Sequence, residues 1–152
     1  MTKKVVTAKV TSTLRSVCKS MLDNNIGCVV ILNSTLQGVD PVGIITERDV
    51  VKLVSLIDGF NPEVPIRSFM ATPLVTANPT MTLFNTMQIM RRKNIRRLPI
   101  IEKSKSPQKL VGIITEKDIA KAIEKSRKKS KANKRITRVR HVPETYKLPT
   151  QI

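Results

Sequence analysis

The sequence predicts an α/β (α+β) fold of two tandem βαββα repeats packed as a pseudo-twofold pair. The ten residues Gly43–Lys52 return almost unchanged as Gly112–Lys121, a shift of 112 − 43 = 69 residues. Shorter matches keep that shift without a gap: Thr13-Leu14 with Thr82-Leu83, and Asn25-Ile26 with Asn94-Ile95. Two copies are too few for a solenoid, in which each unit stacks on its neighbours. We therefore expect the two copies to bury one shared face.

Five elements are predicted in the first repeat. Val5–Ala8 is a short strand, and Thr11–Thr13 supplies residues that favour a helix N-cap. Leu14, Val17, Met21 and Leu22 then fall on one helical face, and Ile26-Gly27 ends this helix. The remaining segments are an apolar strand at Cys28–Leu32, a polar loop at Asn33–Asp40, a strand at Val42–Ile45, and a helix from Thr46 to about Ile57.

The second repeat follows the same order, and the rest of the chain is a linker and a tail. Its predicted elements are Val75–Ala77, Thr82–Lys93, Arg97–Ile101, the loop Glu102–Gln108, Leu110–Ile114 and a helix from Thr115. Turn residues mark the linker. The predicted boundaries are repeat 1 at 1–60, the linker at 61–69, repeat 2 at 70–125 and a basic C-terminal tail at 126–152.

Charge is the most unusual feature of the composition. The 152 residues contain 28 Lys and Arg against 11 Asp and Glu, a formal net charge of +17. Residues 121–140 hold ten of these cations and one acid, Glu124. Such an excess indicates a polyanionic partner: nucleic acid, an acidic protein or an anionic surface. Because like charges four residues apart disfavour a helix, we expect a frayed or disordered tail that orders on a partner.

The cysteines and the N-terminus indicate a cytoplasmic protein. Cys18 and Cys28 lack metal-ligand spacing and are typical of small core residues in a reducing compartment. No signal peptide is recognisable, and no apolar run has the ~20 residues that a membrane span needs. We expect no membrane association and no metal.

Thr46-Glu-Arg-Asp49 and Thr115-Glu-Lys-Asp118 each follow a predicted strand and open a helix. A Thr with an acid three residues later is typical of a helix capping box, which is a purely structural role. The same geometry also suits a ligand, because N–H groups at a helix start attract phosphate. A fixed carboxylate can accept hydrogen bonds from ribose hydroxyls. Gly43 and Gly112 would let a base approach closely.

The repeated pattern Gly-Ile-Ile-Thr-Glu-x-Asp, with Arg97-Leu-Pro-Ile-Ile101 before its second copy, resembles the paired CBS (cystathionine β-synthase) domain, or Bateman module. The resemblance covers about Lys4 to Lys125. It implies two βαββα units with a cleft between them that binds AMP, ADP, ATP, S-adenosylmethionine or a dinucleotide. It also implies a regulatory role, with adenosine nucleotide as the ligand and no required cofactor.

The resemblance assigns candidate site residues in both copies. Thr46 with Asp49, and Thr115 with Asp118, would hold ribose and phosphate. The basic residues before the Leu-Pro pair, Arg96 and Arg97, would contact phosphate. The residues expected to line the adenine are Val5, Val6, Thr7, Leu74, Val75 and Thr76, together with Gly43 and Gly112.

The two copies differ at the basic pair. Arg96 and Arg97 align with Gly27 and Cys28, so repeat 1 supplies no cationic side chain there. We therefore predict two unequal clefts, one suited to a phosphorylated nucleotide. A purely solvated basic face, continuous with Arg91–Lys93, is the structural alternative for this pair.

Catalysis is not expected. The chain has one histidine, His141 in the tail, and neither cysteine has a base nearby in sequence. There is no glycine-rich phosphate loop. Any output of ligand binding is expected to pass through an effector protein or through a homodimer formed by the apolar faces of the helices at 13–24 and 82–93.

The alternative function is RNA or DNA binding. Contacts would be mostly to phosphate and therefore salt-dependent, with a terminal adenosine in the cleft as one variant. The scarcity of aromatic residues argues against a dedicated single-strand reader. A third reading is an adaptor that docks on an acidic protein. The candidate nucleic-acid contacts are Arg91, Arg92, Lys93, Lys125, Arg127, Lys128, Lys129, Lys131, Lys134 and Arg135.

Overall fold

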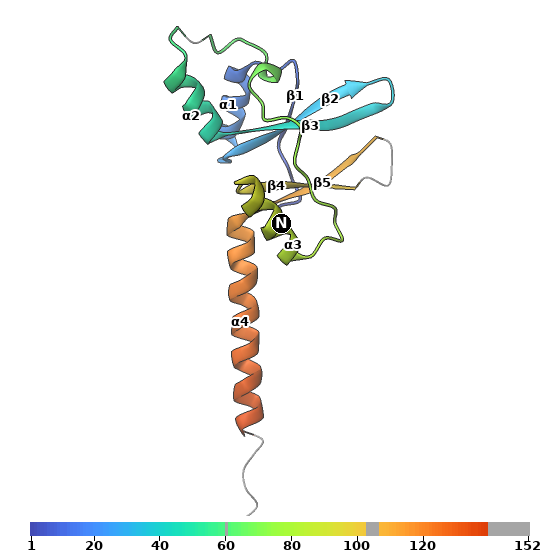
Figure 1. Ribbon diagram of the computed structural model, residues 1–152, viewed down its shortest axis with the longest axis vertical. Coiled ribbons are helices and arrows are strands. Elements are labelled where there is room, and N and C mark those ends of the chain that lie inside the picture. Colours follow the sequence, from blue (N-terminus) through green and yellow to red (C-terminus); the bar gives the residue numbers. More distant parts are fainter. Residues whose placement is uncertain (60, 103–106, 140–152) are drawn as a thin grey trace, which may run out of the picture. The chain divides into compact units, whose positions relative to one another are not determined.

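The computed structural model describes residues 1–59, 61–102 and 107–139, the side chains of 129–139 excepted (Figure 1). The chain divides into two compact units. Met1–Glu116 holds repeat 1 and most of repeat 2, and the second unit begins at Lys117. The predicted mixed α/β fold with a repeated unit is confirmed.

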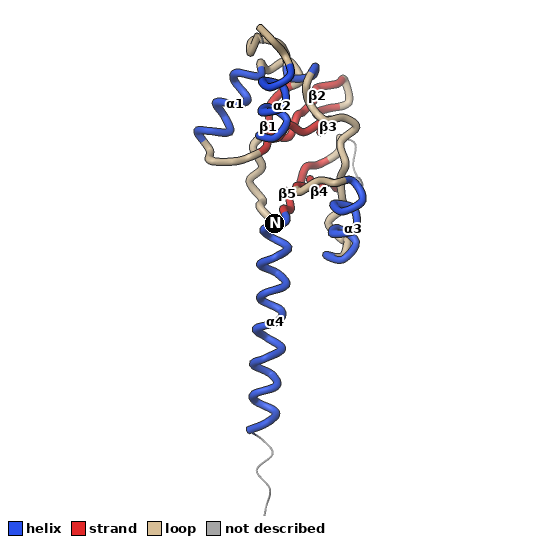
Figure 2. The backbone as a smooth tube through the Cα atoms, turned by 60° about the vertical axis from the view of Figure 1, so that its left-hand side comes forward, coloured by secondary structure: helices blue, strands red, loops and turns tan. Residues whose placement is uncertain are grey.

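The elements follow the predicted order, and Figure 2 separates helices from strands by colour. Repeat 1 contains β1 (Thr7–Lys9), α1 (Leu14–Asp23), β2 (Cys28–Thr35), β3 (Gly38–Thr46) and α2 (Glu47–Leu56). A short 3₁₀ helix, η1 (Ile66–Ser68), lies in the predicted linker. Repeat 2 contains α3 (Leu83–Lys93), β4 (Arg97–Glu102) and β5 (Lys109–Thr115), and α4 (Glu116–Val139) follows.

Matching local signals begin and end the helices of both repeats. The hydroxyl oxygens of Thr13 and Thr82 accept hydrogen bonds from the backbone N–H three residues later, which stabilises the N-termini of α1 and α3. Both helices are followed by an asparagine with positive φ: 49° at Asn25 and 50° at Asn94. Asparagine tolerates this left-handed conformation better than most residues.

The two sheets differ by one strand. In repeat 1, β1 runs parallel to β2, and β2 pairs with β3 in the antiparallel direction. In repeat 2, β4 and β5 form an antiparallel pair, with a register shift between Ile100 and Ile101 that matches the shift between Ile31 and Leu32 in repeat 1. The predicted strand Val75–Ala77 is wrong, because only Ala77 pairs, in a single bridge with Ile100.

Two prolines explain the missing strand. In repeat 1 the Val30 N–H donates to the Val6 carbonyl, and the Val10 N–H donates to the Leu32 carbonyl. The 69-residue shift places Pro99 at the position of Val30 and Pro79 at that of Val10. Proline has no N–H to donate. Repeat 2 therefore cannot form the counterparts of these two bonds, which align β1 with β2 in repeat 1.

Three other predictions need correction. The loop predicted at Asn33–Asp40 is much shorter, since β2 continues to Thr35 and β3 begins at Gly38. Leu22, predicted on the buried face of α1, is 81% exposed. The basic segment expected to fray is helical as far as Val139. Lys, Arg and Ala favour helix, and Glu124 Oε1 lies 2.8 Å from Lys128 Nζ in a favourable i,i+4 pair.

The core of repeat 1 includes a side chain from the predicted linker. Ile66 is fully buried against Leu14, Val17, Ile31 and Ile45. The Leu14 N–H donates to the Val64 carbonyl and the Arg15 N–H to the Pro62 carbonyl, at 3.1 and 2.9 Å. The linker therefore satisfies the first N–H groups of α1, and residues 62–66 are structurally part of repeat 1.

Each repeat completes the sheet edge of the other. Thr2 bridges Ile113 in β5, and Ala71 bridges Ile44 in β3. The two bridges are related by the sequence shift, since 2 + 69 = 71 and 44 + 69 = 113. This exchange is direct structural evidence for the predicted pseudo-twofold relation, and it places the leading segment of each copy on the opposite copy.

Candidate functional site

The first Thr-x-x-Asp motif forms a complete capping box at the start of α2. Asp49 Oδ2 accepts hydrogen bonds from the Thr46 N–H at 2.9 Å and from the Thr46 hydroxyl at 2.7 Å. The Asp49 N–H donates back to Thr46 Oγ1 at 3.4 Å. Both bonds to the carboxylate use Oδ2, and within the described part of the chain Oδ1 has no hydrogen-bond donor.

The start of α2 offers fewer N–H groups than the sequence suggested. The Glu47 N–H donates to the Gly27 carbonyl at 3.1 Å, and the Asp49 N–H is taken by Thr46. Among the described residues, the Arg48 N–H has no protein acceptor. One backbone donor, rather than a cluster, is therefore available to an anion at this helix end.

Arg97 connects the two repeats at this position. It stands opposite Thr115 in the β4–β5 ladder, yet its Nη2 lies 3.8 Å from Glu47 Oε2 in repeat 1. A side chain added at Gly27 would clash with the Arg97 guanidinium and with Glu47. The absence of a side chain at Gly27 therefore makes room for Arg97. Repeat 1 carries no cation at the two positions aligned with Arg96 and Arg97, and Arg97 of repeat 2 brings one beside Glu47.

Arg96 points to its own repeat. Its Nε lies 3.7 Å from Glu116 Oε2, and both side chains are largely exposed, at 74% and 63%. Arg97 is only 28% exposed. The adjacent arginines therefore separate, with Arg96 beside Glu116 and the less exposed Arg97 at the start of α2.

Cys28 lies within this charged group. It faces Thr46 in the β2–β3 ladder and is half-buried. Burial raises the pKa of the Cys28 thiol above its ordinary value, while Arg97 lowers that pKa and Glu47 raises it. The pKa of the Cys28 thiol therefore depends on both charges. Among the described residues, no group of three His, Cys, Asp or Glu side chains could hold a metal ion.

The second motif spans the boundary between the two units. Thr115 ends β5 within Met1–Glu116, and Asp118 lies in the first turn of α4, in the unit that begins at Lys117. Both residues already have interaction partners. The residues of the first motif, by contrast, all lie in one unit together with Arg97.

The predicted adenine-lining residues lie in several environments. Val6 packs against the core of repeat 1, Val5 is half-buried and Thr7 is exposed in β1; Leu74, Val75 and Thr76 are half-buried. The open side of Gly43 faces Met70 and Ala71, and that of Gly112 faces Met1 and Thr2. Protein atoms thus lie where a Cβ would stand at both glycines, so a larger residue at either position would displace them.

The predicted nucleic-acid residues are distributed over both units. Arg91, Arg92 and Lys93 are exposed in the last turn of α3, where cations also favour the helix dipole. Lys125, Arg127 and Lys128 are exposed on α4. The backbone of Lys129, Lys131, Lys134 and Arg135 belongs to the same helix.

Sequence reasoning missed Glu47, Glu116 and Gly27. A signal for the two glutamates was present, because the residue after Thr is Glu in both motifs. It also missed an apolar cavity of about 240 Å³ in repeat 2, between α3 and the β4–β5 pair. Leu83, Thr86, Ile100 and Ile114 line this cavity, and Met1 contributes to its wall. None of the predicted site residues lines it.

The chain belongs to the CBS domain family, whose model matches residues 1–56 and 66–125. An uncharacterized protein of Methanopyrus kandleri is 41% identical over 76% of this chain and 56% of its own length. The match thus spans little more than half of that relative. A CBS domain-containing protein of Bacillus subtilis, YhcV, is 33% identical over 79% of both chains.

Solved structures support the same fold. An uncharacterized conserved protein from Pyrococcus horikoshii matches with a TM-score of 0.68 at 28% identity, over 80% of this chain and 86% of that one. A Pyrobaculum aerophilum CBS domain protein solved with AMP gives 0.67 at 24% identity, over 78% and 85% of the two chains. The CBS domain pair of protein MJ0100, solved with 5′-methylthioadenosine and S-adenosyl-L-methionine, gives 0.69 at 23% identity, over 83% and 93%.

Proposed function

We propose that this chain is a non-catalytic regulatory module that binds an adenosine nucleotide of the AMP, ADP or ATP class between its repeats and signals to a partner. CBS domains are generally regulatory. Two structural neighbours bind adenosine compounds, AMP in one case and 5′-methylthioadenosine with S-adenosylmethionine in the other. The observation that carries the proposal is the position of Arg97, which adds a cation from repeat 2 to the capping box of repeat 1.

Each side chain has a proposed role at this site. Asp49 Oδ1 accepts a ribose hydroxyl while Oδ2 remains bound to Thr46. Arg97 and the Arg48 N–H bind phosphate, because arginine and a helix start both favour anions. The Arg97–Glu47 contact is long, at 3.8 Å, and Glu47 is 66% exposed, so it is easily broken.

Binding would change the contact between repeats. A phosphate that engages Arg97 competes with Glu47, so the nucleotide breaks the ion pair that links repeat 2 to α2. A ligand acts as a switch only if it prefers one arrangement of the protein. Competition for Arg97 provides such a preference, and the changed surface near α2 would be read by an effector protein.

The test is thermal unfolding with AMP, ADP, ATP, S-adenosylmethionine, 5′-methylthioadenosine and NAD. A ligand at 100 times its dissociation constant stabilises a protein by about 2.7 kcal/mol. We expect an adenine nucleotide to raise Tm, and Arg97→Gln and Asp49→Asn to abolish the shift. Arg96→Gln and the cap variant Thr13→Ala are matched controls that should keep it. No shift with any ligand, or an equal loss in the controls, would contradict the proposal.

RNA or DNA binding is the second candidate, favoured by the exposed Lys125, Arg127 and Lys128 on α4. Such binding should weaken steeply with salt, because each neutralised phosphate releases counterions. Replacing these three residues by Gln should reduce the slope of log K against log salt. A slope that does not change would rule out their contribution.

The proposed setting is a cytoplasmic homodimer. Among the described residues, no helix is long and apolar enough to cross a membrane. The apolar faces predicted for dimerisation are largely used within the protein itself, since Leu14, Val17 and Met21 of α1 and Met90 of α3 are buried. Leu22 of α1 and Phe84 of α3 stay exposed, at 81% and 66%, but each helix also has a buried face. On α2, which has no buried residue, Val51 and Val54 are 63% and 61% exposed. We place the dimer contact on α2, and Val51→Glu should lower the mass measured by light scattering to that of a monomer.

A further inference from the structure

The cavity in repeat 2 is the counterpart of a filled site in repeat 1. The shift of 69 residues relates its lining residues Leu83, Thr86, Ile100 and Ile114 to Leu14, Val17, Ile31 and Ile45. These four counterparts are at most 1% exposed, and Ile66 of the linker is packed among them. No described residue occupies the place of Ile66 in repeat 2. A cavity of about 150 Å³ already accommodates a benzene molecule, so about 240 Å³ is ample for an aliphatic side chain.

The backbone around the cavity matches as well. In repeat 1, the carbonyls of Pro62 and Val64 accept from the N–H groups of Arg15 and Leu14, and the Ile66 N–H donates to the Ser12 carbonyl at 2.8 Å. The corresponding groups in repeat 2 are the N–H groups of Phe84 and Leu83 and the Met81 carbonyl. Among the described residues, neither N–H has a protein acceptor. Repeat 2 therefore presents the same hydrogen-bonding edge without the segment that binds it.

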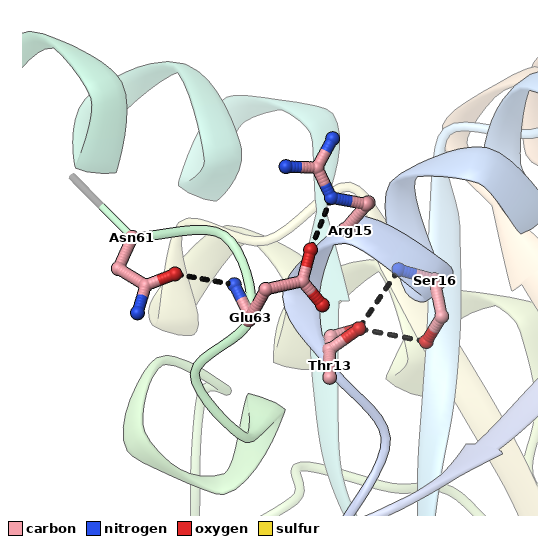
Figure 3. A network of polar contacts seen from close by, with 5 residues as sticks. All are labelled: Thr13, Arg15, Ser16, Asn61 and Glu63. Carbon is pink, nitrogen blue, oxygen red and sulfur yellow. Dashed lines mark hydrogen bonds and ion pairs between the residues drawn. The ribbon is translucent and has the colours of Figure 1, made fainter.

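One side chain changes the chemistry of that edge. Arg15 forms an ion pair with Glu63 of the linker, whose own N–H donates to Asn61 Oδ1 (Figure 3). The residue that corresponds to Arg15 is Phe84, which is 66% exposed. A segment bound to repeat 2 would thus meet an aromatic ring where the linker meets a cation. Its residue at the position of Glu63 should be apolar.

We propose that this cavity and edge are a docking site for an extended peptide of a partner protein. An aliphatic side chain of the peptide fills the cavity as Ile66 does in repeat 1. Two peptide carbonyls accept from Leu83 and Phe84, and an apolar residue three positions before the aliphatic one packs on Phe84. In repeat 1 the corresponding surface binds the Val-Pro-Ile segment of the linker.

The linker itself supplies the probe. Two peptides of residues 61–68, one with the natural sequence and one carrying Glu63→Leu, are titrated into the ¹⁵N-labelled full chain. We expect the amide signals of Leu83 and Phe84 to shift and those of Leu14 and Arg15 to stay, because the chain's own linker already occupies the latter. Ile66→Asp in the peptide should weaken binding at least about tenfold, since a buried aliphatic side chain contributes that much.

A charge exchange makes the test specific. The full chain should bind the peptide that carries Glu63→Leu more tightly than the natural one. The Phe84→Arg variant of the chain, changed at an exposed position, should bind the peptide of natural sequence more tightly. No shift at Leu83 and Phe84 with millimolar peptide, or the same affinity for the Ile66→Asp peptide, would overturn the proposal. Concentration-dependent shifts of these amides without peptide would also overturn it, by showing that a second copy of the chain fills the site. Shifts confined to the cavity methyl groups with benzene, and none with peptide, would overturn it in favour of a small apolar ligand.

Discussion

At the scale of single residues, the charges around Cys28 are the most informative feature of the inter-repeat site. Arg97 and Glu47 come from different repeats and act on this thiol in opposite directions. Their positions depend on Gly27, because a larger residue there would displace both side chains. A reagent that reacts with Cys28 can therefore measure the electrostatics of the site without a ligand.

Removing the Glu47 charge should make Cys28 more reactive. Glu47 raises the pKa of the thiol, so Glu47→Gln lowers that pKa and increases the thiolate fraction at pH 8. We expect iodoacetamide to label Cys28 faster, by less than about tenfold, since one pKa unit changes the thiolate fraction tenfold. Peptide-resolved mass spectrometry separates Cys28 from Cys18. Glu116→Gln, the same change at the symmetry-related position, should have no effect, and equal acceleration by both would contradict the assignment.

At the scale of elements, helix starts could be predicted from the sequence, whereas the pairing between strands could not. Thr13, Thr46 and Thr82 marked helix starts correctly, because capping involves residues within one turn. The strand at 75–77 failed because its hydrogen bonds depend on Pro99, a residue on another strand. The same limit applies to the site. The Thr46–Asp49 box was readable from spacing, whereas the direction of Arg97 depends on how the repeats pack.

Restoring the N–H at position 99 should restore part of the missing strand. In Pro99→Val the new N–H can donate to the Val75 carbonyl, as Val30 donates to Val6 in repeat 1. One hydrogen bond contributes about 1 kcal/mol, and the loss of proline costs about 0.4–1 kcal/mol through the unfolded state. The free energy of unfolding should thus change little, so the decisive measurement is slow hydrogen exchange of the amide introduced at position 99. The converse change, Val30→Pro, should speed exchange in β1 and lower Tm.

The long helix α4 is a second element whose behaviour can be tested. Like charges four residues apart oppose it, and the Glu124–Lys128 pair and its composition favour it. A peptide of residues 116–139 should gain helicity by circular dichroism as salt rises, because repulsion is screened over about 10 Å at 0.1 M. Glu124→Gln should lower helicity most at low salt. Helicity that falls with salt would show that the ion pair outweighs the repulsion.

At the scale of the whole molecule, the sequence repeat does not coincide with the structural one. The predicted boundary at residue 60 divides repeat 1 from Ile66 and Ala71, which complete its core and its sheet edge. A fragment of residues 1–72 retains the entire core cluster of repeat 1, whereas a fragment of residues 1–60 lacks the fully buried Ile66.

The two fragments should behave differently. We expect 1–72 to unfold cooperatively in urea and 1–60 to show no transition. Even Ile66→Ala in the 1–72 fragment should reduce stability by about 2–5 kcal/mol, the range for a fully buried isoleucine. Leu36→Ala, at an exposed hairpin position, is the matched control and should leave the midpoint unchanged. A cooperative transition in 1–60 would show that the linker is dispensable.

The bridge between Thr2 and Ile113 also has a consequence for folding during synthesis, because the two residues are made at different times. The partner of Thr2 lies 113 − 2 = 111 residues further along the chain. At typical ribosome speeds of about 5–20 residues per second, Ile113 is made about 6–22 s after Thr2. During that interval β5 has not been made, so the segment around Thr2 lacks the strand that it pairs with. The segment around Thr2 can therefore reach its final place only after β5 has been made, and until then its backbone groups are open to mispairing.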